Sequence, residues 1–318
     1  MTDTPTWLLW AERGAAALSL VAVAWALVTE AGGIVHGHPA YMVMLAVTVL
    51  VAVTVLVLSI VRRTSRPGWR RALRVTAVPV ALVWVLVLAW FRPFSAVSPA
   101  LEAMQDDASV TVSETATSIV LEPIADASGV GVLFQPGALV DARAYAAVLR
   151  PLAEAGHTVV IPKQPLGIAF LATGALDSAR AAHPEVTGWV AGGHSLGGVV
   201  ATIEADAEDG SASSPAVGLL LFGSYPASDV SDTLETAVAS ISGTRDGLST
   251  PEEVEASREN LPASAQFIVV EGASHAQFGD YGPQPGDEEP LISDDEARAQ
   301  ISAAAVEFVS SVASRLGP

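Results

Sequence analysis

The chain has 318 residues, of which 51% are hydrophobic, and its net charge of −18 combines a balance of +5 in residues 1–98 with −23 in residues 99–318. Such an acidic body would repel phosphates, which excludes nucleic acid as a partner, and the absence of cysteine excludes disulfides, thiolate metal sites and a cysteine nucleophile. The composition therefore predicts an apolar, basic head joined to a body large enough for one domain with its own core.

Three apolar segments of the head are candidate membrane spans. Gly14 to Val28 has 15 uncharged residues, Tyr41 to Val61 has 21, and Val75 to Phe91 has 17. A helix needs about 20 apolar residues to cross the hydrocarbon core, so the first segment is the weakest. An alternative is that Trp7–Ala31 is a cleaved signal peptide. We predict a membrane region with three transmembrane helices over residues 1–98.

Arginines predict the orientation of these spans. Six of them fall around the connection between the second and third spans: Arg62, Arg63, Arg66, Arg70, Arg71 and Arg74. Loops rich in arginine stay in the cytoplasm, whereas the loop from Thr29 to Ala40 has no Lys or Arg, as an outside loop should. His36 and His38 in that loop have no neighbouring metal ligands in the sequence. We therefore expect a multi-pass protein of the cell membrane whose N-terminus is cytoplasmic and whose body is extracytoplasmic.

The body is predicted to be an α/β domain. Residues 99–117, rich in Ala, Ser, Thr and acids, are expected to be a tether, and residues 118–318 the domain itself. Strands are expected at Ser118–Glu122, Gly129–Phe134, His157–Ile161, Gly188–Ala191, Val217–Phe222, Ala237–Ser242 and Gln266–Val270. Helices are expected at Asp141–Ala155, at Leu196–Ala207, after Thr250 and at Asp294–Leu316. Apolar strands that alternate with helices are typical of a doubly wound, mostly parallel sheet.

A Gly-x-Ser-x-Gly motif lies where one of these strands meets the next helix. Ser195 stands between Gly193 and Gly197, so the turn can be tight and the helix N-terminus can direct N–H groups at developing negative charge. The alternative is a serine that only caps the helix. The strand–turn–helix context favours a nucleophile. His194, His157 and His183 are expected to be structural.

A serine nucleophile needs a base and an acid that orients it. Asp246 follows the next-to-last predicted strand and His275 follows the last, so both side chains should reach the carboxyl edge of the sheet near Ser195. Glu271 and Asp280 are competing acids. For the oxyanion, the backbone N–H of Leu196 is one expected donor. Ala138 is the expected second, because Pro136 in the same loop has no N–H.

These motifs resemble the α/β-hydrolase superfamily, and most closely a bacterial subgroup of often membrane-tethered hydrolases with a Gly-His-Ser-Leu-Gly elbow. The matching stretches are residues 134–145, 192–198, 243–247 and 275–282. The resemblance implies the nucleophile Ser195, the acid Asp246 and the base His275, with oxyanion donors near Ala138 and Leu196. Many relatives have His-Gly where this chain has Pro136 and Gly137. This difference concerns the second oxyanion donor and not the three catalytic side chains.

The sequence therefore predicts a membrane-anchored serine hydrolase that cleaves an ester or related acyl bond of a small-molecule substrate. This mechanism requires neither a metal nor an organic cofactor. The short segment after Phe222 predicts an open site with Tyr225 and Leu166–Phe170 as walls. Such a site favours modest acyl esters or exposed substrates of the cell envelope over long-chain lipids. Two alternatives stay open: a non-catalytic binding module on the same scaffold, and an acyltransferase of the cell envelope.

Overall fold

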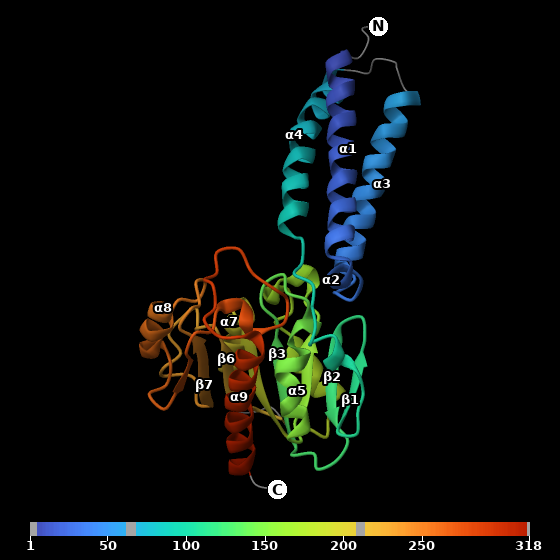
Figure 1. Ribbon diagram of the computed structural model, residues 1–318. Coiled ribbons are helices and arrows are strands. Elements are labelled where there is room, and N and C mark those ends of the chain that lie inside the picture. The colour runs from blue at the N-terminus through green and yellow to red at the C-terminus, as the bar shows by residue number, and fades with distance from the viewer. Residues whose placement is uncertain (1–4, 62–67, 208–213, 317–318) are drawn as a thin grey trace. The chain divides into compact units, whose positions relative to one another are not determined.

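The computed structural model describes residues 5–61, 68–207 and 214–316. The chain divides into two compact units, a helical unit that ends at Pro93 and an α/β unit that runs from Phe94 to the C-terminus (Figure 1). The boundary thus falls a little before the residue 98 at which the charge balance changes.

The helical unit consists of three long helices and one short one. The long helices are α1 (Thr6–Thr29), α3 (Ala40–Val61) and α4 (Gly68–Trp90), and α2 (Ala31–Val35) follows α1. Each long helix has the length and apolar composition needed to cross a membrane, as the sequence predicted. Of the six arginines used to predict orientation, Arg62, Arg63 and Arg66 lie outside the described residues, as does the side chain of Arg70.

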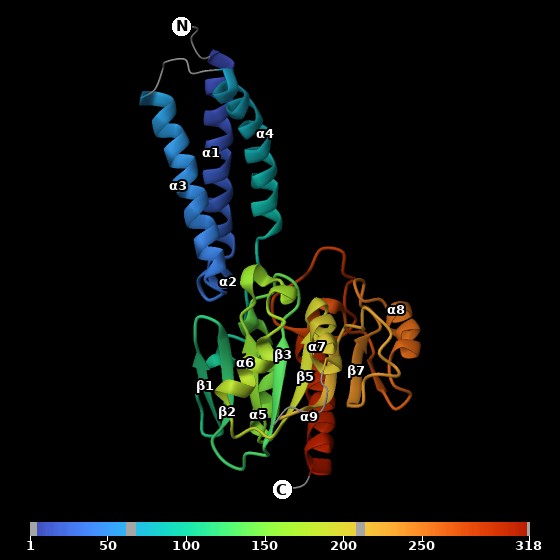
Figure 2. The same cartoon turned by 180° about the vertical axis from the view of Figure 1, so that it is seen from behind.

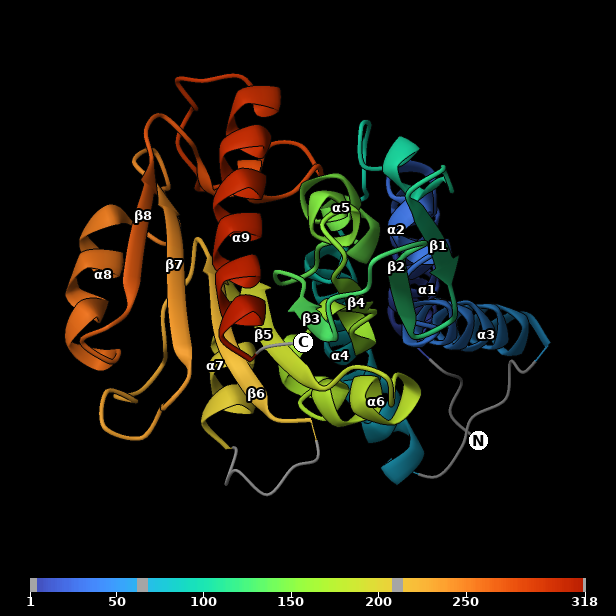
Figure 3. The ribbon, with the colours of Figure 1, turned by 90° about the horizontal axis from the view of Figure 1, so that it is seen from below.

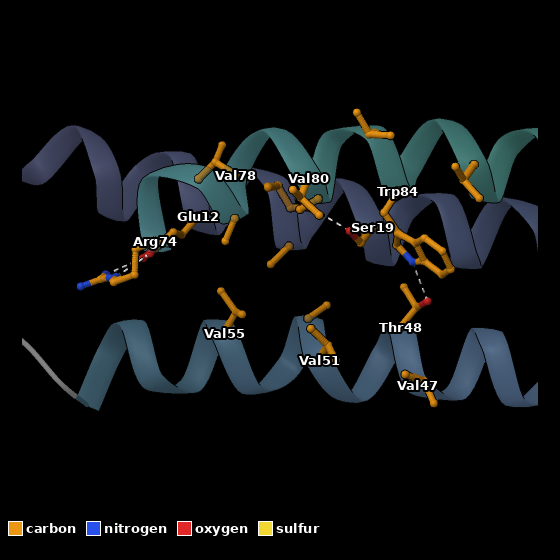
Figure 4. A pocket seen from close by; sticks show the side chains of 17 residues that line it. Glu12, Ser19, Val47, Thr48, Val51, Val55, Arg74, Val78, Val80 and Trp84 are labelled. Atoms are coloured by element: carbon orange, nitrogen blue, oxygen red, sulfur yellow. Dashed lines mark hydrogen bonds and ion pairs between the residues drawn. The ribbon is translucent and has the colours of Figure 1, made fainter. Parts of the chain in front are cut away.

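Polar groups in this unit are paired between helices. The Arg74 guanidinium of α4 donates two hydrogen bonds of 2.6 Å to the Glu12 carboxylate of α1, and the Trp84 indole donates to the Thr48 hydroxyl at 3.0 Å. Both pairs border a cavity of about 600 Å³ lined mainly by valine and alanine (Figure 4). Pairing of this kind lowers the cost of polar side chains in apolar helices.

The α/β unit is built on one sheet, which has eight strands in the described residues. Its strands are β1 (Val110–Glu114), β2 (Ser118–Pro123), β3 (Val130–Gln135), β4 (Thr158–Pro162), β5 (Gly188–His194), β6 (Ala216–Phe222), β7 (Ala237–Gly243) and β8 (Gln266–Val270). They are arranged in the order β1-β2-β4-β3-β5-β6-β7-β8. The pairings of β1 with β2 and of β2 with β4 are antiparallel, and the others are parallel. The seven predicted strands and the doubly wound fold are confirmed.

Helices cover both faces of this sheet. One face is covered by α5 (Ala146–Glu154) and α9 (Asp294–Leu316), and the other by α6 (Ala175–Ala182) and α7 (Leu196–Asp206), as Figures 2 and 3 show. Each face has its own apolar core, one around Phe134, Leu149 and Phe308 and the other around Trp189 and Leu219. Two buried faces explain why the central strands are apolar almost throughout. The carboxyl ends of β3, β5, β6, β7 and β8 consequently meet at one edge.

The segment predicted as a tether is part of this unit. It contains β1, whose Val110 is fully buried, and the helical turn η1 (Glu102–Met104). Upstream of η1 lies Phe94–Val97, a segment that we call the strap. It is held by hydrogen bonds from Phe94 N to Leu139 O at 2.8 Å and from Val97 N to Asp280 O at 2.9 Å. The domain start at residue 118 was therefore wrong, because the short apolar stretch of β1 is surrounded by polar residues in the sequence.

This difference predicts where a soluble form can begin. A protein that starts at Pro93 should be monodisperse without detergent, whereas one that starts at Ser109 lacks the strap and η1. The two strap bonds above and the one from Asp141 N to Phe94 O each contribute about 1 kcal/mol, so the shorter form should have a melting temperature roughly 10 °C lower. Thermal unfolding of both forms measures this, and equal melting temperatures would show that the strap adds no stability.

Candidate active site

Ser195 occupies a sharp turn between β5 and α7. Its backbone has φ 52° and ψ −123°, a conformation that L-residues with a side chain rarely adopt. Such strain costs about 1–3 kcal/mol and persists only where the surroundings impose it. The serine is thereby held at the carboxyl edge of the sheet, directly before the first N–H groups of a helix.

Glycines on both sides make this turn possible. A Cβ atom on Gly193 would lie 2.4 Å from the carbonyl carbon of Gly197, and one on Gly197 would lie 2.1 Å from the carbonyl oxygen of Gln135. These are backbone atoms that cannot move aside without displacing β3 or α7. The predicted strand–turn–helix arrangement around Ser195 is thus present, and the two glycines are required by close backbone approach.

Asp246 and His275 come together from neighbouring strand ends. His275 Nδ1 lies 2.8 Å from Asp246 Oδ2 and 3.0 Å from Asp246 Oδ1, and the two residues are 1% and 2% exposed. The carboxylate also accepts hydrogen bonds from the backbone N–H groups of Leu248 at 2.9 Å and Ser249 at 2.6 Å. Since an ionised carboxylate only accepts, His275 Nδ1 must donate, and in the neutral imidazole this leaves Nε2 as the nitrogen without a proton. In the described part of the chain, this buried Nε2 has no hydrogen-bond partner.

Neither competing acid is bonded to the His275 ring within the described residues. Asp280 pairs with Arg298 at 2.8 Å, and Glu271 is exposed at the end of β8. Burial raises the pKa of the Asp280 carboxyl, and Arg298 opposes that shift. Of the three candidate acids, the structure thus brings Asp246 to the histidine.

The loop after β3 leaves one N–H group free. Pro136 has none, Gly137 N donates to the Tyr145 hydroxyl at 2.9 Å, and Leu139 N donates to Gly167 O at 2.8 Å. Among the described residues, Ala138 N has no acceptor. Leu196 is the first residue of α7, where N–H groups have no partner within the helix. The two backbone groups predicted as oxyanion donors are thus available for hydrogen bonding.

Tyr145 and His194 join this loop to the turn at Ser195, and their link was not predicted. The Tyr145 hydroxyl accepts from Gly137 N and lies 2.9 Å from His194 Nδ1, to which it can donate. Burial lowers the pKa of His194, so its ring stays neutral and can accept at Nδ1. The same ring packs against His275 with a centroid separation of 4.4 Å. From the sequence, Tyr145 was placed only within the helix expected at Asp141–Ala155.

A buried carboxyl, that of Glu204, is hydrogen-bonded to Gln135, the residue directly before the loop that follows β3. Glu204 of α7 accepts a hydrogen bond from Gln135 Nε2 at 3.2 Å, and Gln164 Nε2 donates to Gln135 Oε1 at 2.9 Å and to Pro136 O at 3.0 Å. Burial raises the pKa of Glu204 to about 7. The carboxyl therefore takes up a proton near neutral pH while bonded to the residue before Pro136.

This shift predicts a dependence of stability on pH. Between the ordinary pKa of 4.5 and the folded value of about 7, the folded protein binds the proton more tightly than the unfolded chain does. The stabilisation is complete below pH about 4.5 and is lost as the pH rises through about 7, a total on the order of 3 kcal/mol. Thermal unfolding from pH 5 to 8 should show a flatter profile for Glu204→Gln than for the wild type or the exposed control Glu259→Gln. Parallel profiles would contradict the assignment.

Three further side chains have the spacing of metal ligands. The ligand atoms of Glu122, His183 and Glu185 all lie within 4.8 Å of one another. His183 and Glu185 precede β5, so they lie at the opposite end of that strand from Ser195. His183 Nδ1 is 3.2 Å from the Glu185 carboxylate, so the ring nitrogen has a hydrogen-bond partner without a metal ion. His157 is likewise satisfied by the Ser128 hydroxyl at 2.7 Å.

Comparison with known proteins places the chain in a family. Residues 131–299, more than half of the chain, match the alpha/beta hydrolase family. The chain therefore belongs to this family, which agrees with the sheet order and with the turn at Ser195. No curated protein sequence matches the chain.

Several solved structures are similar to this chain at low sequence identity. The esterase domain of a Rhodothermus marinus protein is 14% identical with a TM-score of 0.46, and the match covers 61% of this chain and 92% of that one. Est1E from Butyrivibrio proteoclasticus is 12% identical with a TM-score of 0.47, covering 64% and 99%. A dienelactone hydrolase from Anabaena variabilis is 18% identical with a TM-score of 0.44, covering 65% and 96%. These similarities are remote and concern the fold alone.

Proposed function

We propose that this protein is a membrane-anchored serine hydrolase that cleaves an ester or related acyl bond through Ser195, His275 and Asp246. The observation that carries the proposal is the buried pair of Asp246 and His275, whose imidazole packs on the ring of His194, the residue before the strained turn at Ser195. A neutral imidazole whose Nδ1 donates to a carboxylate can remove a proton from a serine hydroxyl.

The reaction follows from these groups. As Ser195 Oγ attacks the acyl carbon, His275 Nε2 takes its proton, and the Asp246 carboxylate stabilises the resulting imidazolium. The N–H groups of Leu196 and Ala138 would hold the oxyanion of the tetrahedral intermediate. His275 then returns the proton to the leaving oxygen, which gives an alcohol and an acyl-enzyme. A water molecule, activated by the same nitrogen, releases the acid and restores the serine.

Compact acyl esters are the substrates that the walls of the site favour. Between β6 and β7 the chain forms turns without a helix, so this segment supplies no extended cap over the edge of the sheet. Phe170 and Leu171 expose apolar side chains in the segment that follows Gly167, the residue bonded to Leu139. The turn that carries these two side chains contacts α7, the helix that begins after Ser195, and apolar groups there suit an acyl group of a few carbons better than a long chain.

A substrate panel tests the proposed reaction. The full chain in detergent should hydrolyse nitrophenyl acetate and butyrate faster than the palmitate, with little activity on the matching anilides. Ser195→Ala, prepared in the same way, is the control for adventitious esterase. Equal rates for wild type and Ser195→Ala on every substrate would contradict hydrolysis by this site.

The proposed localisation is the cell membrane, with three spans, a cytoplasmic N-terminus and the hydrolase unit outside. It rests on the three apolar helices and on the six arginines between Val61 and Val75. A reporter fused after Arg66 should be active only in its cytoplasmic form, and alkaline phosphatase fused after Pro318 should be active. A stable but silent phosphatase fusion at Pro318 would contradict this topology.

A further inference from the structure

Asp287 accepts four backbone hydrogen bonds in the segment between η6 (His275–Phe278) and α9. Its Oδ1 accepts from Gly247 N at 3.0 Å, His275 N at 3.1 Å and Glu288 N at 2.9 Å, and its Oδ2 accepts from Ala276 N at 2.8 Å. A carboxylate that accepts this many N–H bonds is held in one orientation. Neither the motifs nor the resemblance pointed to this residue.

The four donors include both loops of the proposed acid and base. Gly247 directly follows Asp246, and His275 and Ala276 begin the turn that carries the base. Closer to the strand ends, the same loops are joined by hydrogen bonds from Arg245 N to Ala273 O and from Gly272 N to the Thr244 hydroxyl. Beyond these, within the described residues, the Asp287 carboxylate joins the backbone of one loop to that of the other.

Close backbone approach supports the same contact. A Cβ atom on Gly247 would lie 2.8 Å from Gly286 O and 2.9 Å from Glu288 N. The loop of the acid therefore packs directly on the backbone that carries Asp287, and only glycine fits between them. The backbones of Gly247 and of residues 286–288 are therefore in close contact.

The charge of Asp287 is maintained by the same donors. Burial alone would raise the pKa of its carboxyl, but the backbone N–H groups of Gly247, Ala276, His275 and Glu288 outweigh burial and lower that pKa. The group is therefore ionised at neutral pH, when each N–H bond to it is charge-assisted. Neutral replacements of the same size should hold the loops less well.

We propose that Asp287 is a positioning residue, whose carboxylate holds the His275 loop in the register that brings Nδ1 onto Asp246 and Nε2 toward Ser195. This inference rests on the proposed function, since it assigns His275 the role of base. Misplacement of a catalytic group by about 1 Å can cost about 10²-fold in rate. Loss of the Asp287 carboxylate should therefore act on turnover more than on substrate binding.

The test uses the full chain in detergent and a nitrophenyl butyrate assay. Asp287→Ala should lower kcat about 10²-fold with KM changed by less than about threefold, and Asp287→Asn, which keeps one acceptor oxygen, should fall between it and the wild type. Glu289→Gln removes a charge from an exposed neighbour and should retain wild-type kcat. If Asp287→Ala fails to fold, Gly247→Ala replaces it, since its Cβ should push the loop of the acid away from the backbone that carries Asp287 and give the same split.

A proton resonance separates this inference from the proposed function. With histidine labelled by nitrogen-15, the low-field signal of the His275 Nδ1 proton, which lies in the bond to Asp246, should shift or broaden in Asp287→Ala and stay unchanged in Glu289→Gln. Wild-type kcat and an unchanged signal in folded Asp287→Ala would overturn the positioning role while Ser195→Ala still lost activity. If the wild type had no hydrolase activity, the proposed function would fail, and an unchanged signal in Asp287→Ala would overturn the positioning role as well.

Discussion

Ser195→Ala is expected to lower kcat for any accepted ester by about 10⁶-fold, and His275→Ala by a similar factor. Without the hydroxyl no acyl-enzyme can form, and without the imidazole the hydroxyl keeps its proton. Because the proposed mechanism has the two groups act in one proton transfer, the double variant should be little slower than either single variant. Steady-state rates of the three variants, each divided by the concentration of folded protein, measure these losses in kcat.

A control variant and two possible contrary results complete this test. A serine on the surface of the same unit, changed as Ser231→Ala, provides a matched control and should leave kcat unchanged. Additive losses, in which the double variant fell far below both singles, would show that Ser195 and His275 act in separate steps. Retention of normal kcat by folded Ser195→Ala would remove the nucleophile from the mechanism.

Asp246→Asn should lower kcat by about 10⁴-fold while the fold is kept. The amide oxygen can still accept from Leu248 N and Ser249 N, which turns the amide nitrogen toward His275 Nδ1. Nδ1 must then accept and the proton moves to Nε2, so the imidazole faces the serine with the wrong atom. Kinetics and unfolding of the purified variant measure the two effects separately.

Glu271→Gln and Asp280→Asn are the comparison variants for this acid. Glu271 is exposed, and Asp280 is paired with Arg298. Both variants should keep most of the wild-type kcat, although Asp280→Asn weakens one ion pair. Near-normal kcat in Asp246→Asn together with a large loss in either comparison variant would reassign the acid and leave the hydrolase proposal in place.

Features that depend on local sequence were predicted well. The turn at Ser195 follows from two glycines, an apolar strand before them and a helical pattern after them, all within a short stretch of chain. The order of Asp246 and His275 after consecutive strands was also readable, because parallel strands bring their carboxyl ends to one edge. The three long apolar helices were visible from their length and lack of charge.

Features that depend on contacts between distant segments were not predicted. Tyr145 and His194 are far apart in sequence, and nothing in either neighbourhood indicates that the hydroxyl of one meets the ring of the other. Asp287 lies among other acidic residues and accepts from loops that precede it. β1 was missed because a strand of five residues at the sheet edge is recognised by the strand it pairs with, here β2.

Covalent labelling shows whether Ser195 is a nucleophile activated by His275. The full chain in detergent is treated with a fluorophosphonate, digested and analysed by mass spectrometry. We expect one phosphonate adduct, on the peptide that contains Ser195, and loss of that adduct in Ser195→Ala and His275→Ala. A folded wild type without the adduct, or an adduct on a different serine, would rule out Ser195 as the nucleophile.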